Sequence, residues 1–366
     1  MGKRQRSVED LGLNIIMQNF YKDKRVFITG YTGFKGSWLC EILLKFNAKI
    51  CGYALPPEEL SLFNILDLKN KCENNFADIR DLSKLKKAIK DFKPEIIFHL
   101  AAQPIVLASY NDPVYTYETN VMGTVNILEA ARECDSLKSF VNITTDKVYE
   151  NKEWPWGYRE NENLCGFDPY SNSKSCSELV TYSYKHAFFN NESSPAVSTA
   201  RAGNVIGGGD FAANRIVPDC VRAALKGDKI ILRNPKSIRP YQHVLDCLNG
   251  YLILAMKQHE DKKFAGSYNF GPNESDSVTT EFLAKTFCEA WGEGVSYEAN
   301  VNANAPHEAN ILKLDCSLAK NILAWHPKWN VAKAISSIAE WTKAWREGNV
   351  KAQACIDAQI SEFFNL

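Results

Sequence analysis

The chain has 366 residues, a length typical of about two domains, and 45% of its residues are hydrophobic, which is enough for a large core. Its 43 basic and 43 acidic residues balance, which argues against a broad nucleic-acid-binding surface. The 11 cysteines form no C-x-x-C pair and the 6 histidines form no H-x-x-x-H pair, so we expect neither a metal site nor a disulfide framework.

Residues 1–19 have the character of an added N-terminal extension. The extension is basic, but Glu9, Asp10 and Asn14 interrupt its apolar positions, so it is a poor signal peptide. No stretch of the chain reaches the apolar length of a membrane span. We therefore expect a cytoplasmic protein that does not contact a membrane, and the scattered thiols fit a reducing cytosol.

From Arg25 onward, apolar runs alternate with segments of helical spacing, which predicts a parallel sheet with helices on both faces. The predicted strands are 25–30, 48–55, 94–102, 138–144 and 196–201. The predicted helices are 36–46, 81–92, 114–134 and 170–189. The fold class we expect is α/β, with a Rossmann-type doubly wound sheet in residues 20–203 and a later return around 241–264. Glycine and proline punctuate the chain after Asn204, which favours a smaller mixed α/β domain, mainly in residues 204–366.

The stretch TGYTGFKG spaces Gly30, Gly33 and Gly36 between the first strand and the first helix. Glycines at this junction permit a tight turn and a close approach of the backbone to a pyrophosphate, and the helix N-terminus favours the anion. The alternative is an ordinary glycine-rich turn. Because the strand and the helix flank the loop in the required order, we predict a dinucleotide site.

The second strand ends without an Asp or Glu for the ribose of NAD and without an Arg for the 2′-phosphate of NADP. Glu58 and Glu59 would repel such a phosphate, so we favour NAD. Asp78 follows the next expected strand and could accept a hydrogen bond from the adenine amino group. Capping of the following helix by Asp78 or Asp81 is an equal alternative.

Two further groups of polar residues point to chemistry. Tyr170 and Lys174 are four residues apart on one predicted helix, where the ammonium would lower the pKa of the phenol and let it remove a hydroxyl proton. Thr145, Asp146 and Lys147 end a buried strand, at the edge where parallel sheets bind ligands. The structural alternatives are a surface Tyr–Lys pair and a capped strand end with a salt bridge.

These motifs, together with HLAAQPIV, WGYRENE, ARAGNVIGGGD and RNPKSIRPYQHV, resemble the extended short-chain dehydrogenase/reductase family from about Phe20 to the C-terminus. Within the family the sequence is similar to the nucleotide-sugar 4,6-dehydratases, and among them to the branch that acts on CDP-glucose. The resemblance implies bound NAD, a CDP-glucose or related nucleotide-sugar substrate, and deoxysugar synthesis for surface polysaccharide. It also implies a homodimer or a dimer of dimers, built on a four-helix bundle of helices 114–134 and 170–189.

The same resemblance implies three sets of site residues. The catalytic residues would be Thr145, Asp146, Lys147, Tyr170 and Lys174. The cofactor would contact Tyr170 and Lys174 and also Gly30, Gly33, Phe34, Gly36, Asp78, Ile79, Leu100, Ala101, Ala102, Gln103 and Asn120. The nucleotide sugar would contact Gln103, Thr145, Asn204, Arg233, Arg239 and His307.

Dehydration of a 6-hydroxy sugar needs one acid and one base beyond the tyrosine. Thr145 would bond the C4 oxygen, Asp146 would protonate the departing C6 hydroxyl, and Lys147 would either take the C5 proton or only orient Asp146. A 4-epimerase needs neither group, so the trio favours dehydration. The alternatives are a 4,6-dehydratase or 4-epimerase for another nucleotide sugar and, from a different class, a non-catalytic NAD-sensing module.

Each of two loops has two alternative interpretations. The stretch 233–244 is either a diphosphate clamp, because arginine forks match phosphate oxygens, or a solvated basic loop. The aromatic stretch 154–162 either covers the sugar or packs beneath the neighbouring loop.

Overall fold

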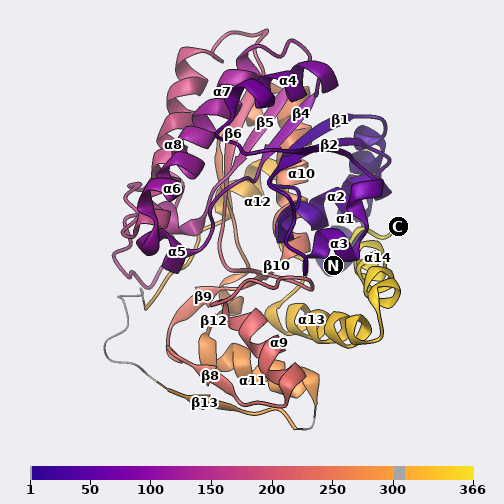
Figure 1. Ribbon diagram of the computed structural model, residues 1–366, viewed down its shortest axis with the longest axis vertical. Helices are drawn as coiled ribbons and strands as arrows, with labels where there is room; N and C mark the ends of the chain where they lie inside the picture. The colour runs from indigo at the N-terminus through magenta and orange to yellow at the C-terminus, as the bar shows by residue number, and fades with distance from the viewer. Residues whose placement is uncertain (1, 293, 301–309) are drawn as a thin grey trace.

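The computed structural model describes residues 2–292, 294–300 and 310–366. An upper lobe is built around a parallel sheet, and a smaller lower lobe lies beneath the carboxyl ends of the strands (Figure 1). The predicted nucleotide contact His307 lies outside the described residues.

The sheet of the upper lobe has seven strands in the order β11-β6-β5-β4-β1-β2-β3, and every neighbouring pair is parallel. The strands are β1 (Arg25–Thr29), β2 (Lys49–Ala54), β3 (Glu73–Phe76), β4 (Ile96–His99), β5 (Ser139–Ile143), β6 (Ala196–Ala202) and β11 (Ser267–Phe270). From β1 the chain winds outward first through β2 and β3, then through β4, β5 and β6. This confirms the predicted Rossmann-type doubly wound sheet.

Helices cover both faces of the sheet (Figure 1). One face packs against α1 (Gly2–Tyr21), α2 (Phe34–Lys45) and α10 (Val244–Glu260). The other face packs against α4 (Leu82–Phe92), α7 (Gly123–Arg132) and α8 (Pro169–Ala187). Alternation along β1 separates the two cores, because Val26 and Ile28 enter the first and Phe27 enters the second.

The predicted helix 114–134 is divided in the structure. It comprises α6 (Pro113–Tyr117), a π-helical turn at Glu118–Met122, and α7. Asp112 caps α6 by accepting a hydrogen bond from the Tyr115 amide, and Pro113 occupies the first turn. Short helices α3 (Leu62–Ile65) and α5 (Val106–Asn111) fill connections for which the sequence made no prediction.

The lower lobe mixes helices with short strands around a separate core, which confirms a mixed α/β C-terminal part. Its elements are α9 (Ile216–Lys226), β8 (Ile230–Leu232), β9 (Ile238–Pro240), β12 (Ser277–Thr279), α11 (Thr280–Trp291), β13 (Tyr297–Ala299) and α13 (Val331–Arg346). The pair β8–β13 is parallel, whereas β9–β12 is antiparallel. A short parallel pair, β7 (Val205–Ile206) with β10 (Gln242–His243), lies where the chain passes between the lobes.

The chain returns to the upper lobe over a longer segment than 241–264. Besides α10, the strand β11 completes the sheet beside β6, and α12 (Ser317–Leu323) packs on β11. The last helix, α14 (Asn349–Phe364), packs against α3 and α13. These late segments return because they bury apolar surface against elements far away in sequence, which local sequence patterns do not reveal. The domain boundary at residue 203 stays a prediction.

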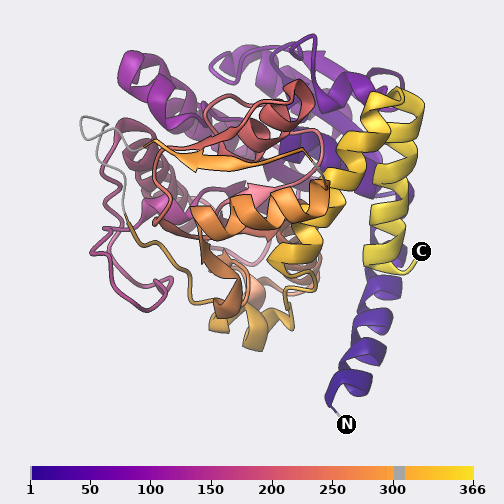
Figure 2. The same ribbon diagram turned by 90° about the horizontal axis from the view of Figure 1, so that it is seen from below.

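The N-terminal extension forms most of helix α1. Figure 2 shows α1 running past the end of α14. Met17 and Tyr21 are fully buried, and the Tyr21 hydroxyl donates to the Leu252 carbonyl of α10 at 2.8 Å. The Asn14 amide donates to the Phe364 carbonyl at 2.8 Å. Across the described residues, we find no helix with both the length and the apolarity needed to span a bilayer.

Docking of α1 predicts a large effect on stability at Met17 and a small one at its neighbour Ile16. Met17→Ala should lower the free energy of unfolding by about 2–5 kcal/mol, because it leaves a cavity between α1 and the upper core. Ile16→Ala should change it by less than about 0.5 kcal/mol, because Ile16 is 55% exposed. Urea unfolding followed by circular dichroism measures both, and equal effects would contradict the docked position of the helix.

Candidate active site

The turn between β1 and α2 is shaped to approach an anion. Gly30 has φ +71°, and a Cβ there would lie 2.7 Å from the Ala101 amide nitrogen. A Cβ on Gly36 would lie 2.4 Å from the Gly30 carbonyl oxygen, so the turn closes only with glycine at both positions. The N-cap Gly33 has no side chain to occupy the first amides of α2, and the amide of Phe34 begins the helix. The fit is that of a pyrophosphate cradle.

The end of β4 is fastened next to this turn. The Thr29 hydroxyl accepts hydrogen bonds from the amides of Leu100 and Ala101, both at 3.1 Å. Asn120, in the π-helical turn, accepts from the Gln103 amide at 2.8 Å, and its own amide donates to the Gln103 carbonyl and the Ser173 hydroxyl. Asn120 therefore holds the backbone of Gln103 on both its amide and its carbonyl side. The half-buried Ala102 lies within the segment that these bonds hold.

The Gln103 side chain makes its hydrogen bonds within the chain. Its amide group donates to the Thr116 hydroxyl at 2.9 Å, and its carbonyl oxygen accepts from the Ile105 amide at 2.6 Å. A contact between Gln103 and a ligand would therefore come from its backbone or require these bonds to open.

The loop after β3 contains an acidic pair with two different roles. Asp81 is the N-cap of α4 and accepts from the Lys84 amide at 3.0 Å. Asp78 pairs with Arg80, whose hydrogen bonds hold the pKa of the Asp78 carboxyl below its usual value. Ile79 is 5% exposed and packs beneath Gly123. An open cavity of about 520 Å³ lies here, and its lining residues are Asp78, Arg80, Asp81, Glu118, Met122 and Asn126.

The polar end of β5 turns inward. Thr145 is the N-cap of the short 3-10 turn Asp146–Val148, and its hydroxyl donates to Asp146 Oδ1 at 3.0 Å. Burial raises the pKa of Asp146, although the nearby Lys147 ammonium opposes the shift. The second oxygen, Oδ2, is buried without a hydrogen-bond partner among the described residues. Asp146 therefore keeps its proton to a higher pH than an ordinary aspartic acid does.

Helix α8 presents Tyr170 and Lys174 on the face that packs toward β5. The Lys174 ammonium donates to the Ile143 carbonyl at 3.1 Å. Burial, aided by the charge of Lys35, lowers the pKa of Lys174 to about 7. Burial raises the pKa of Tyr170 to about 12, and a hydrogen bond with Thr145 only partly offsets that shift. The lowered Tyr170 pKa expected from the sequence is therefore not found, because burial outweighs the neighbouring charges.

The expected substrate contacts from the C-terminal half fall in different places. Arg239, 3% exposed, lies close enough to Asp146 for its charge to act on that carboxyl. The Asn204 carbonyl accepts from the Gln242 amide at 3.2 Å, at the junction between the lobes. Arg233 is more than half exposed and pairs with Asp219 of α9 at 3.3 Å. The structure thus places Arg239 near Asp146, whereas Arg233 takes part in an ion pair on the surface.

Comparisons with known proteins show the family of the chain. The family model described as GDP-mannose 4,6 dehydratase matches residues 27–338. The CDP-glucose 4,6-dehydratase of Salmonella typhimurium is 47% identical over 357 residues, which cover 96% of this chain and 99% of that protein. The chain belongs to the GDP-mannose 4,6 dehydratase family. The predicted resemblance to the nucleotide-sugar dehydratases of the extended short-chain dehydrogenase/reductase family is confirmed.

Other members and structures agree on the fold. The GDP-mannose 4,6 dehydratase of Drosophila melanogaster is 26% identical and covers 87% of this chain and 85% of that protein. The crystal structure of dTDP-glucose 4,6-dehydratase from Bacillus anthracis in complex with NAD matches with a TM-score of 0.74 and 21% identity, over 88% of this chain and 98% of that one. The UDP-glucose 4-epimerase of Thermus thermophilus matches with a TM-score of 0.75 and 23% identity, over 87% and 99%.

Sequence reasoning missed two cationic residues near Tyr170 and Lys174. Lys35 lies inside the glycine motif, and its charge acts on Lys174, while Asp146 and Arg215 act on Lys35. Arg215, which pairs with Asp210 at 3.1 Å, also acts on Tyr170. The position of Lys35 between Phe34 and Gly36 was a signal for it. Arg215 had none, because the packing of the two lobes brings it near.

The low pKa of Lys174 predicts a specific pH dependence of stability. The unfolded chain keeps this side chain protonated up to its ordinary value of 10.5, whereas the native protein releases the proton above about 7. Between these pH values the unfolded state binds more protons, so stability rises with pH. Lys174→Met should remove up to about 1.4 kcal/mol of that rise per pH unit, measured by urea unfolding from pH 7 to 10.

A matched control is Lys87→Met. Lys87 is exposed and pairs with Asp91, which raises its pKa, so this variant should keep the wild-type slope between pH 7 and 10. If Lys174→Met keeps the wild-type slope as well, Lys174 is not the buried titrating group.

Proposed function

We propose that this protein is a CDP-glucose 4,6-dehydratase, a hydro-lyase that converts CDP-glucose into CDP-4-keto-6-deoxyglucose and water with bound NAD. The observation that carries the proposal is the 47% identity to the Salmonella typhimurium enzyme of that name across nearly the full length of both chains. The site geometry supports it, because the strand-end acid and the Tyr170–Lys174 pair lie together at one edge of the sheet.

The residues present fit a dinucleotide. The turn at Gly30 and Gly36 and the uncapped start of α2 would hold the pyrophosphate. The segment Leu100–Gln103, held by Asn120, would line the middle of the cofactor, and the cavity beside Asp78 would take the adenine end. When bound, NAD supplies a reversible acceptor for a hydride next to the sugar.

Asp146 is the acid of the elimination. Burial raises its pKa, which makes it a suitable proton donor to the departing C6 hydroxyl. The C6–O bond then breaks and the protonated hydroxyl leaves as water. Lys147 is half-buried, and we find no hydrogen-bond acceptor for its ammonium among the described residues. It either takes the C5 proton or orients Asp146.

Tyr170 removes the proton of the C4 hydroxyl while Thr145 bonds the same oxygen. A pKa of about 12 is too high for a base near neutral pH, so catalysis requires positive charge close to the phenol. Arg215, whose charge acts on Tyr170, is in position to provide it, and Lys174, one helical turn away, can add positive charge below its own pKa of about 7. Arg239, beside Asp146, would face the diphosphate.

The alternatives stay testable. A dehydratase or 4-epimerase for another nucleotide sugar would use the same cofactor site, and an NAD-sensing module would turn over no sugar. We propose a cytoplasmic location and a role in deoxysugar synthesis, as expected from the sequence.

The decisive experiment incubates the protein with CDP-, dTDP-, UDP- and GDP-sugars and follows product mass. Loss of one water from CDP-glucose alone supports the proposal. An unchanged mass with inverted C4 would indicate an epimerase, and no turnover would indicate the sensing module.

The acid–base variants separate the chemical steps. Asp146→Asn and Lys147→Met should each lower kcat by about 10²–10⁴-fold, because elimination loses its proton transfer. Oxidation at C4 should survive, so single turnovers should accumulate reduced nicotinamide, measured by its absorbance. A variant that forms the 4-keto-6-deoxy product at the wild-type rate would remove that residue from the mechanism.

We also propose a homodimer or a dimer of dimers. Helix α6, the π-helical turn at Glu118–Met122 and helix α8 pack against one another, and they expose large apolar side chains. These are Val114, Tyr117, Met122, Leu179 and Tyr182. An exposed apolar surface that spans adjacent helices is typical of an interface between protein chains.

Light scattering on a sizing column tests the association. Leu179→Glu, at a position 54% exposed, should convert the assembly toward monomers, because it buries a charge in the interface. Val350→Glu on α14 is the matched control, since Val350 is 84% exposed outside this surface and should keep the wild-type mass. A monomeric wild-type protein would refute the proposal.

A further inference from the structure

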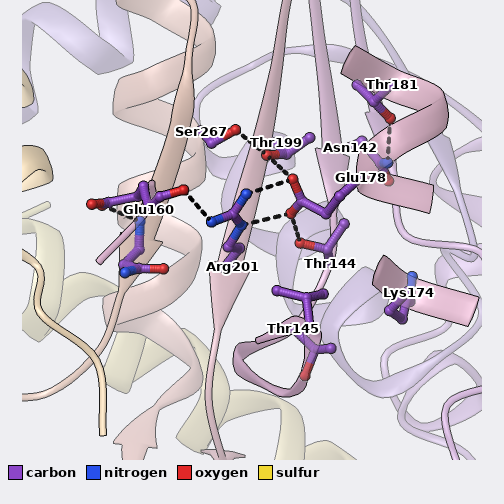
Figure 3. A network of polar contacts seen from close by, with 12 residues as sticks. Asn142, Thr144, Thr145, Glu160, Lys174, Glu178, Thr181, Thr199, Arg201 and Ser267 are labelled. Atoms are coloured by element: carbon purple, nitrogen blue, oxygen red, sulfur yellow. Dashed lines mark hydrogen bonds and ion pairs between the residues drawn. The ribbon is translucent and has the colours of Figure 1, made fainter. Parts of the chain in front are cut away.

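A buried ion pair lies directly behind the catalytic strand end (Figure 3). Arg201 of β6 donates to both carboxylate oxygens of Glu178 of α8, each at 2.9 Å, and their side chains are only 3% and 2% exposed. The two parallel hydrogen bonds form the bidentate geometry that arginine makes with a carboxylate. Neither residue belongs to the predicted catalytic or ligand-binding sets.

The pair is satisfied on all sides. Glu178 also accepts from the hydroxyls of Thr144 at 2.5 Å and Thr199 at 2.7 Å. Arg201 also donates to the Tyr149 hydroxyl at 2.8 Å and the Glu160 carbonyl at 2.9 Å. Removing two charges from water costs several kcal/mol per ion, so a buried pair persists only when such hydrogen bonds compensate it. Burial opposes ionisation of Glu178, yet Arg201 and the hydroxyls hold its pKa below the ordinary value.

The partners of the pair bracket the catalytic segment. Thr144 immediately precedes Thr145 and Asp146, and Tyr149 follows the 3-10 turn that contains Lys147. Glu178 is one helical turn beyond Lys174 on the same face of α8. The Glu160 carbonyl belongs to the aromatic stretch 154–162, and the Glu160 carboxylate accepts from the Asn269 amide of β11 at 2.8 Å. One ion pair therefore touches both ends of the acid-bearing turn, the helix of the Tyr–Lys pair and the adjoining loop.

We propose that Glu178 and Arg201 are positioning residues that hold the 144–149 segment against the Tyr170–Lys174 face of α8. They act through Thr144 and Tyr149 and do not touch the substrate. This role rests on the proposed dehydratase function for its kinetic consequences, whereas its structural part stands on the network alone.

Two hydroxyl deletions test the role with matched chemistry. Thr144→Val and Thr199→Val each remove one hydroxyl donor from the same carboxylate, and Thr199→Val also removes a hydrogen bond with Ser267, but only Thr144 adjoins the proposed catalytic residues. Positioning predicts that Thr144→Val lowers kcat about tenfold to a hundredfold with KM changed less than about twofold, because misplacement by about 1 Å has effects of this size. Thr199→Val should keep kcat within about twofold. Substitution of Glu178 itself would leave Arg201 unpaired and endanger folding, so the hydroxyl variants are preferable.

Amide hydrogen exchange on the full-length variants tests the same role without substrate. Exchange in the peptide containing residues 144–149 should be faster in Thr144→Val than in Thr199→Val, at matched global stability. Equal exchange rates, or equal kcat values, would overturn the positioning role and leave the pair as general support of the core. Wild-type turnover of CDP-glucose tests the proposed function separately: if it fails, the exchange comparison still decides the structural part.

Discussion

The position of β1 between β2 and β4 is the constraint on which the rest of the site depends. Parallel pairing on both sides brings the turn after β1 and the end of β4 to one edge of the sheet. The Thr29 hydroxyl then joins the two segments by accepting hydrogen bonds from the amides of Leu100 and Ala101. Since β5 pairs with β4, the same parallel register brings Thr145 and Asp146 to that edge of the sheet as well. The crevice at such a switch point is where doubly wound sheets bind ligands.

Burial at this edge has two different outcomes for charged groups. Asp146 has one oxygen without a hydrogen-bond partner among the described residues, and its pKa is raised. Glu178 is also buried. It accepts two hydrogen bonds from Arg201 and two from threonine hydroxyls, and its pKa is lowered. The difference lies in the number of donors, because hydrogen bonds to the charged form offset desolvation. A carboxyl group with a raised pKa, just after β5, and a fixed ion pair between α8 and β6 are thus both buried at this edge of the sheet.

Local patterns predicted much of this arrangement. The spacing of Tyr170 and Lys174 placed them on one helical face, and the glycine spacing predicted the turn that Gly30 and Gly36 close. The electrostatic consequence of the Tyr–Lys pair was wrong, because burial raises the Tyr170 pKa. Burial depends on everything packed around a side chain, and a four-residue spacing carries no information about it.

The sequence by itself determined the alternation of strands and helices in the upper lobe, the glycine turn after β1, the polar end of β5 and the family. Each of these is written in periodicity, in glycine positions or in short motifs, which act over a few residues. Only the tertiary structure decided which distant residues meet: Arg201 with Glu178, Asn120 with the Gln103 backbone, and Arg215 with the neighbourhood of Tyr170. Such pairs are separated by many residues along the chain. They meet because the sheet register and the packing of the helices bring their elements together, and no local preference of either residue encodes that meeting.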